Sequence, residues 1–117
     1  MTPTIVLKDN KPFLVVGSPG GSTIITTTMQ TILNVIDYEM DIKEAVCAPR
    51  FHSQWLPDVI QIEPRGLTKD VLVNLKSRGH EIIYRGGYIG ESNGIMITDE
   101  GFFGGGDCRG ETSALGY

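Results

Sequence analysis

A glycine-rich turn is the part of this 117-residue sequence whose residue types could do chemistry. The run Gly17-Ser18-Pro19-Gly20-Gly21-Ser22-Thr23 separates the apolar stretch 13–16 from a long helix-like pattern. A turn of this kind can point successive backbone N–H groups at one spot, close to the positive end of a helix dipole. Such a spot binds an anion: a phosphate, a carboxylate or the oxyanion of an acyl-transfer intermediate.

The residues around this turn limit what it can bind. A Walker-type phosphate loop needs a lysine after its last glycine, and no lysine stands near Gly21. The dinucleotide pattern Gly-x-Gly-x-x-Gly is absent from the turn as well. An oxyanion site needs only well-placed backbone donors shielded from water. The alternative without function is a strand-to-helix turn whose glycines serve only a positive φ, and the pattern by itself favours that alternative.

The segments that flank the turn must position it. Residues 4–8 and 12–17 are predicted strands joined by a turn at 9–11. The segment 23–38 is a predicted helix because its apolar residues recur at steps of four, three and four, which makes one helix face: Ile25, Met29, Ile32 and Ile36. The β-branched run 26–28 disfavours an isolated helix, so tertiary packing must override that preference.

The rest of the chain alternates helices and strands. A second helix is predicted to begin after Asp41, with Glu44 completing a capping box, and to stop at Pro49. A third spans 68–78 and ends at Gly79; its inward residues are predicted to be Val71, Leu72 and Leu75. Further strands are predicted at 59–63, 80–84 and 94–98, with a turn at 99–101. This order predicts an α+β fold with a largely antiparallel sheet.

Composition excludes several classes of function. Hydrophobic content of 40% and charged content of 21% are typical of a globular protein. The net charge of −4, without a cluster of Lys and Arg, argues against a nucleic-acid surface. No apolar run approaches the roughly 18 residues of a membrane span. The first residues lack the pattern of a signal peptide, so the chain expressed alone is expected to stay in the cytoplasm.

The cysteines and histidines do not form a recognisable ligand pattern. Cys47 and Cys108 are far apart and lack the CxxC spacing. A disulfide between them stays open, but the spacing favours two unpaired thiols. Neither cysteine stands near His52 or His80 at a metal-ligand spacing. We therefore expect neither a metal site nor a cofactor.

Several motifs spaced along the chain carry a family resemblance. They are Met1–Val6, Gly17–Ser22, Asn34–Asp37, Ala48–His52, Gln54–Asp58 and the closing Gly116-Tyr117. In this order they resemble the C-terminal part of gamma-glutamyltranspeptidases, which are N-terminal-nucleophile hydrolases. The resemblance implies a partial αββα-type fold, with residues 1–117 as a single domain from the end of the small subunit.

The resemblance also implies roles for individual residues. Gly20 and Gly21 match the two glycines that bind the substrate and supply the oxyanion hole while a threonine hydroxyl attacks the γ-glutamyl amide. Arg50 and Arg109 match arginines that support the fold and precursor maturation, for which a structural salt bridge is favoured over direct catalysis. His52 is expected to be a hydrogen-bonded structural residue, because the family uses the α-amino group of its threonine as the base.

Departures from the family pattern predict a fragment that is inactive by itself. The nucleophilic threonine and two substrate-binding serines would precede Met1, and we do not expect Thr2 to replace the nucleophile. Cys108 stands where the family usually has proline. The implied partners are the missing N-terminal part and a γ-glutamyl donor such as glutathione, although a poly-γ-glutamate or a β-lactam side chain stays open as the substrate.

Three further expectations concern the role of the chain, its oligomeric state and the compartment of the parent protein. The alternative to an enzyme segment is a stand-alone, non-catalytic carboxylate-binding or assembly module. An uncovered sheet edge is expected to pair with another copy of the chain, giving a homo-oligomer. The parent protein is expected to be periplasmic or extracellular, as family members mostly are.

Overall fold

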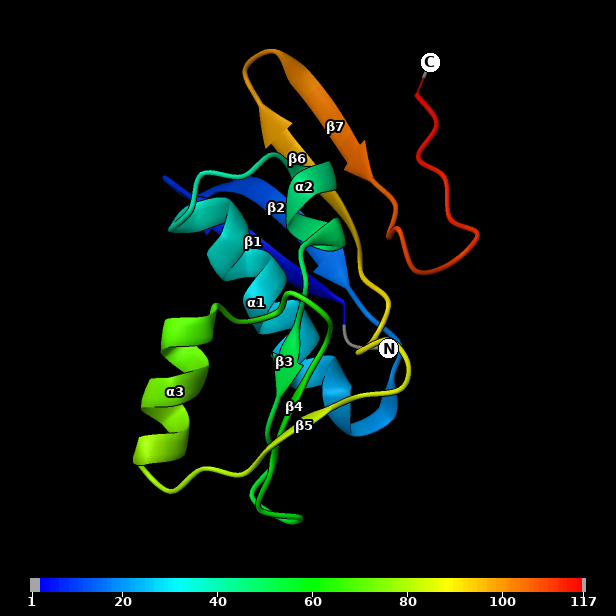
Figure 1. Cartoon of the computed structure of the whole chain (residues 1–117). Helices are drawn as coiled ribbons and strands as arrows, with labels where there is room; N and C mark the ends of the chain where they lie inside the picture. Colours follow the sequence, from blue (N-terminus) through cyan, green and yellow to red (C-terminus); the bar gives the residue numbers. More distant parts are fainter. Residues whose placement is uncertain (1–2, 117) are drawn as a thin grey trace.

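The computed structural model describes residues 3–116, and within them the strands form two sheets (Figure 1). The larger sheet is antiparallel, in the order β1 (Thr4–Lys8), β2 (Lys11–Gly17), β6 (Asn93–Thr98) and β7 (Gly101–Gly105). The smaller has the order β3 (Phe51–His52), β4 (Ile60–Ile62) and β5 (Ile82–Tyr84). The predicted α+β class with largely antiparallel pairing is confirmed, and the exception is the parallel pair β4–β5.

Three α-helices accompany these sheets in the described part of the chain. They are α1 (Ile24–Ile36), α2 (Ile42–Cys47) and α3 (Lys69–Ser77). Helices α1 and α2 contact each other and lie against the larger sheet, while α3 connects the parallel strands β4 and β5 (Figure 1). None of the helices in residues 3–116 is long and apolar enough to cross a membrane.

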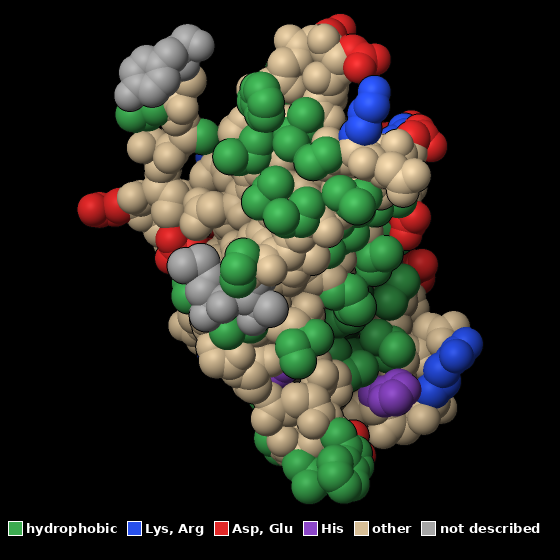
Figure 2. All heavy atoms as spheres, turned by 180° about the vertical axis from the view of Figure 1, so that it is seen from behind, with side chains coloured by type: hydrophobic (Ala, Val, Ile, Leu, Met, Phe, Trp, Pro, Cys, Tyr) green, Lys and Arg blue, Asp and Glu red, His purple; other side chains and the backbone are tan. Residues whose placement is uncertain are grey.

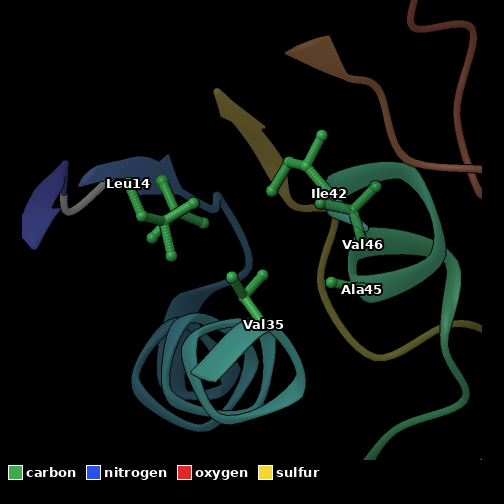
Figure 3. Packing of buried hydrophobic residues seen from close by; sticks show 6 residues of the cluster. Leu14, Val35, Ile42, Ala45 and Val46 are labelled. Carbon is green, nitrogen blue, oxygen red and sulfur yellow. The ribbon is translucent and has the colours of Figure 1, made fainter. Parts of the chain in front are cut away.

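The hydrophobic core lies between the larger sheet and the first two helices (Figure 3). Its fully buried members are Leu14, Val16, Val35, Ile42, Ala45 and Val46. Strand β2 contributes alternate residues because successive side chains of a strand point to opposite faces of the sheet. The strand that leads into the glycine turn is therefore anchored in the core just before the turn begins.

The β1–β2 hairpin and helix α2 form as their sequences predict. The hairpin turn has two residues with positive φ, Asp9 (φ 52) and Asn10 (φ 61), and Asn and Asp tolerate this conformation. Helix α2 carries the predicted capping box, in which the Glu44 N–H donates to Asp41 Oδ1 at 2.7 Å. The helix ends at Cys47, two residues before Pro49.

Helix α1 presents its apolar face to the outside. Ile25 is 77% exposed, and Met29 and Ile36 are also exposed. The inward side instead carries Thr27 and Thr31 together with other buried residues. The polar part of the inward side meets backbone, since the Thr27 hydroxyl lies 3.5 Å from the carbonyl oxygen of Ile89. Toward the C-terminal end of the helix Val35 is buried in the hydrophobic core, and Ile32 of the predicted apolar face packs against that core.

Helix α3 does not bury the residues that its spacing predicts to be inward. Val71 is 38% exposed, Leu72 and Leu75 are half-buried, and the helix has no buried residue. Leu72 and Leu75 are the two residues of α3 that are not exposed, as predicted, whereas the inward position of Val71 was wrong. Burial of this face is incomplete because α3 lies beside the small sheet rather than over the core (Figure 1). Its predicted end is confirmed, since Gly79 follows the helix with φ 90.

Candidate active site

The glycine turn joins the end of β2 to the start of α1. Gly20 has φ 138 and Gly21 has φ 60, both in the region that favours glycine. One turn of 3-10 helix (Gly21–Thr23) follows, held by the Thr23 N–H and hydroxyl, which donate to the Gly20 carbonyl at 3.2 and 2.9 Å. Within residues 3–116 no acceptor takes up the N–H of Gly20 or Gly21. Two exposed donors thus stand at the N-terminal end of α1, where a negative charge is favoured.

Arg50 and Arg109 lie in a buried cluster with two carboxylates. Arg50 is 1% exposed, and its Nη2 lies 2.7 Å from Asp107 Oδ2. Arg109 bridges both acids: Nη2 lies 2.5 Å from Glu63 Oε2 and Nη1 lies 2.9 Å from Asp107 Oδ1. We call Arg50, Glu63, Asp107 and Arg109 the arginine–carboxylate cluster. Two positive and two negative side chains balance there, so each buried charge has partners.

The carboxylates of this cluster were missed by the sequence analysis. Glu63 ended a predicted strand and Asp107 stood beside Cys108, and neither was singled out. Two arginines assigned structural roles need acidic partners if they are buried. This need for acidic partners was the signal that the sequence offered. The spacing of residues does not show which of the 14 acidic residues pair with the two arginines.

Burial and hydrogen bonding shift the pKa values of the cluster residues in opposite directions. Burial by itself raises the pKa of Glu63, but hydrogen bonds from Arg109 and from the N–H groups of Ile89 and Arg50 outweigh it, so the pKa is lowered. The pKa of Asp107 is lowered in the same way, against burial, by the Ser92 N–H and both arginines. Burial lowers the pKa of Arg50, whereas the two carboxylates raise that of Arg109 despite its burial.

These lowered values predict that the protein loses stability in acid. A carboxylate with a lowered pKa in the folded state stabilises the fold fully above its ordinary pKa of about 4, and this contribution is lost as pH falls through the folded value. Urea unfolding between about pH 5 and pH 3 should therefore show falling stability. The Glu63→Gln variant should be less stable at neutral pH and show a shallower fall; an unchanged slope would contradict the assignment.

His52 links α1 to the small sheet. It is 2% exposed; its Nδ1 lies 2.8 Å from Thr26 Oγ1 and its Nε2 lies 2.9 Å from Gln54 Oε1. Gln54 donates its amide to the Leu56 carbonyl, which leaves Oε1 as an acceptor for the ring. Nε2 therefore donates to Gln54 Oε1, while Nδ1 lies within hydrogen-bond distance of the Thr26 hydroxyl, which is also 3.2 Å from the Thr23 carbonyl oxygen. Both ring nitrogens are engaged within the fold, as a structural histidine requires.

The expectation of two unpaired thiols was wrong. Cys47 and Cys108 form a disulfide with a Cα–Cα distance of 5.2 Å, across 61 positions of sequence. The arginine–carboxylate cluster explains how they meet. Arg109 donates to the carbonyl oxygens of Val46 and Ala48, the neighbours of Cys47, and so holds Cys108 beside it. No spacing rule could reveal this contact because it depends on the tertiary fold.

Three further features concern the chain ends, metal binding and the link between the glycine turn and the cluster. Thr2 and Tyr117 lie outside the described residues. Among residues 3–116 there is no group of three or more His, Cys, Asp or Glu side chains that could hold a metal ion. The glycine turn and the arginine–carboxylate cluster are separate in sequence but are connected through the segment 89–92, whose end residues Ile89 and Ser92 are buried and which contacts both.

Comparison with known proteins defines the class. The family model for gamma-glutamyltranspeptidase matches residues 1–117. The chain resembles a gamma-glutamyltranspeptidase variant from Helicobacter pylori with TM-score 0.87 and 54% identity, over 94% of this chain and 61% of that one. A gamma-glutamyltranspeptidase from Pseudomonas nitroreducens matches with TM-score 0.88 and 34% identity, over all of this chain and 62% of that one. The fold is therefore that of the N-terminal-nucleophile hydrolases.

The chain belongs to the gamma-glutamyltranspeptidase family. It is 46% identical over 110 residues to the glutathione hydrolase proenzyme of Escherichia coli, which covers 93% of this chain and 19% of that protein. A relative of a different name, the acylase ACY 1 proenzyme of a Pseudomonas strain, is 31% identical over 108 residues. The chain thus spans about a fifth of the length of these curated relatives.

Proposed function

We propose that this chain is the C-terminal segment of a gamma-glutamyltransferase or hydrolase small subunit, and that Gly20 and Gly21 supply its oxyanion hole. The observation that supports this most is the pair of N–H groups at the start of α1, which no acceptor within residues 3–116 takes up, in a chain of this family. Neither donor has to break a bond within the fold to reach a ligand. A γ-glutamyl donor such as glutathione is the proposed substrate class.

The geometry of the turn suits acyl transfer. A threonine hydroxyl from outside this sequence attacks the carbonyl carbon of the γ-glutamyl amide, and the carbonyl electrons move onto oxygen. The N–H groups of Gly20 and Gly21 donate to that oxyanion, in the positive field of α1. The α-amino group of that threonine, the base implied by the family, takes the hydroxyl proton and passes it to the leaving nitrogen. When the oxyanion collapses, the C–N bond breaks, the amine leaves with this proton and an ester to threonine remains, which water or an acceptor amine then cleaves.

The proposed partner is the rest of the protein. The outward face of α1 is apolar, and a hollow of about 320 Å³ there is lined by residues that include the exposed Ile25, Met29 and Leu33. Hydrophobic side chains also gather on the face seen in Figure 2. In the larger sheet, Ile5 and Ile95 are exposed as well. Large uncovered apolar surfaces indicate an interaction site. Pairing of a further copy along the sheet edges stays a prediction.

The disulfide supports an oxidising compartment for the parent protein. Disulfides persist in secreted and periplasmic proteins and are rare in the cytosol. We therefore propose that the Cys47–Cys108 bond forms after export. In the reducing cytosol the same chain would hold two thiols.

The chain by itself should show no catalysis. Without the threonine, a γ-glutamyl anilide incubated with the 117-residue chain should release no nitroaniline; robust turnover would contradict the proposal. Calorimetry of the same chain with glutamate would test the alternative of a carboxylate-binding module. The positive arm is a chimera: the Escherichia coli proenzyme with its matching segment replaced by this chain, which should mature and turn over the anilide.

Within the chimera, Gly21→Ala tests the oxyanion role. A Cβ on Gly21 has no atom within 4 Å, so the methyl group enters open space at the turn, and the φ of 60 adds backbone strain. We expect kcat to fall by about 100-fold, the scale of losing one oxyanion donor. Gly79→Ala is the matched control, because its Cβ also meets nothing within 4 Å and its φ of 90 is positive like that of Gly21, so both variants carry the same kind of backbone strain. Gly87→Ala, whose Cβ also meets nothing within 4 Å, controls for an added methyl group without a positive φ. Equal activity of Gly21→Ala and these controls would refute the role of Gly21.

A further inference from the structure

We infer that residues 89–92, here called the support segment, position the oxyanion donors, and that Glu63 and Asp107 are positioning residues acting through it. The inference rests on the proposed function of Gly20 and Gly21. The central residue is Gly90, which packs against Gly20 although the two are 70 positions apart in the sequence.

The contact between the two glycines leaves no room for a side chain. A Cβ on Gly20 would lie 3.2 Å from the Cα of Gly90 and 2.6 Å from Thr23 Oγ1. A Cβ on Gly90 would lie 2.4 Å from Thr27 Oγ1 and 3.1 Å from Ser18 Oγ. Gly90 also has φ +65, which L side chains rarely adopt. The backbone of the support segment therefore packs directly on the backbone of the turn and on the first turns of α1.

Both ends of the support segment are held by buried carboxylates. The N–H of Ile89 donates to Glu63 Oε1 at 2.7 Å, and the N–H of Ser92 donates to Asp107 Oδ2 at 2.6 Å. Arg50 donates its Nη1 to the Ile89 carbonyl at 2.9 Å. Ile89 and Ser92 are both fully buried. Charge-assisted hydrogen bonds of this kind are stronger and more directional than neutral ones.

The middle of the support segment is tied to the turn itself. The N–H of Glu91 donates to Ser18 Oγ at 3.4 Å, while the Ser18 hydroxyl donates to the Pro19 carbonyl at 2.6 Å. Ser18 is fully buried. A chain of contacts thus runs from the arginine–carboxylate cluster through the support segment to Gly20. A shift of the support segment would move the two donors relative to the substrate carbonyl, and small misplacements of catalytic groups cost large factors in rate.

The first experiment uses the 117-residue chain and does not depend on catalysis. Amide chemical shifts and hydrogen exchange of Gly20 and Gly21 are compared in wild type, Gly90→Ala and the control Gly87→Ala. Gly90→Ala should shift both amides, and Gly87→Ala should not. Adding Thr27→Ala to Gly90→Ala removes the atom nearest the new methyl and should return the amides toward wild type. Unmoved amides in Gly90→Ala would overturn the inference.

If Gly90→Ala does not fold, Ser18→Ala takes its place, since it deletes the hydroxyl that accepts from the Glu91 N–H and donates to the Pro19 carbonyl. The amides of Gly20 and Gly21 should then shift in the folded variant. The opposite outcome, a folded Ser18→Ala variant with both amides at their wild-type positions, counts against the inference. Neither arm requires a partner protein.

The second experiment separates the inference from the proposed function. In the Escherichia coli chimera, Gly90→Ala should lower kcat on the order of 100-fold and leave KM within a few-fold, because the donors act on the transition state. Loss of activity in Gly21→Ala with full activity in Gly90→Ala would overturn the inference alone. Full activity in both, with shifted amides, would refute the proposed oxyanion role and leave the positional link intact.

Discussion

Replacing Asp107 with asparagine should lower the free energy of unfolding by about 3–5 kcal/mol, the cost of breaking a buried ion pair from one side. Asp107 is 1% exposed and accepts from Arg50, Arg109 and the Ser92 N–H. The neutral amide fills the same space, but both guanidinium groups lose a charged partner and one acceptor oxygen becomes a donor. The measurement is urea unfolding at neutral pH, with the midpoint and the slope both fitted.

The matched control is Asp99→Asn, the same chemical change at an exposed turn position. Surface substitutions of this kind usually change stability by less than about 0.5 kcal/mol. If Asp107→Asn lowers the free energy of unfolding no more than the control does, water or local relaxation replaces the lost charge pairing of the arginines. The cluster would then not be important for the stability of the fold. If Asp107→Asn loses stability but leaves the Gly20 and Gly21 amide shifts of the folded protein unchanged, Asp107 stabilises the fold but does not position the two donors.

Removing the disulfide should cost a comparable amount, about 4 kcal/mol in the chain-entropy model for a loop closed across 61 positions. The mechanism is different, since the cross-link acts mainly by restricting the unfolded chain. The double variant Cys47→Ser with Cys108→Ser should unfold at lower urea concentration than the oxidised wild type. Its stability should equal that of the reduced wild type, because both lack the same constraint.

A reductant provides the internal control for this prediction. It should destabilise the wild type and leave the double serine variant unchanged, so that any direct effect of the reductant is measured in the same series. Equal midpoints for oxidised and reduced wild type would contradict the prediction. Such a result would mean that the cross-link does not restrict the unfolded chain, because that chain is already compact around these residues. In the folded protein, the hydrogen bonds from Arg109 to Val46 and Ala48 would then hold Cys108 beside Cys47 without the disulfide.

Local features of the fold were accessible from the sequence because they depend on neighbouring residues. The Asp9-Asn10 turn and the Asp41–Glu44 capping box each involve groups within four positions, and both form as expected. The glycine turn belongs to the same category: its place between a strand and a helix is visible in the order of residue types. The pattern predicted only a possible anion site of unspecified kind, and the oxyanion role proposed for Gly20 and Gly21 rests on the family resemblance.

Amphipathic spacing was informative about the helices but not about their orientation. The face of α1 that includes Ile25 and Met29 exists, yet it points outward, and Thr27 faces the interior. Periodicity reports that a helix has an apolar side. It does not say whether that side meets the core of the same chain or another surface. For α3 the spacing identified Leu72 and Leu75, which are half-buried, but not the exposure of Val71.

By itself the sequence determined the α+β class, the boundaries of most elements, the family and the turn that carries Gly20 and Gly21. These follow from short-range preferences and from ordered motifs. Only the tertiary structure decided which groups meet across long separations: Cys47 with Cys108, Arg109 with Glu63, and Gly90 with Gly20. The physical reason is that such contacts depend on how the elements pack, and the spacing of residues along the chain does not encode that packing.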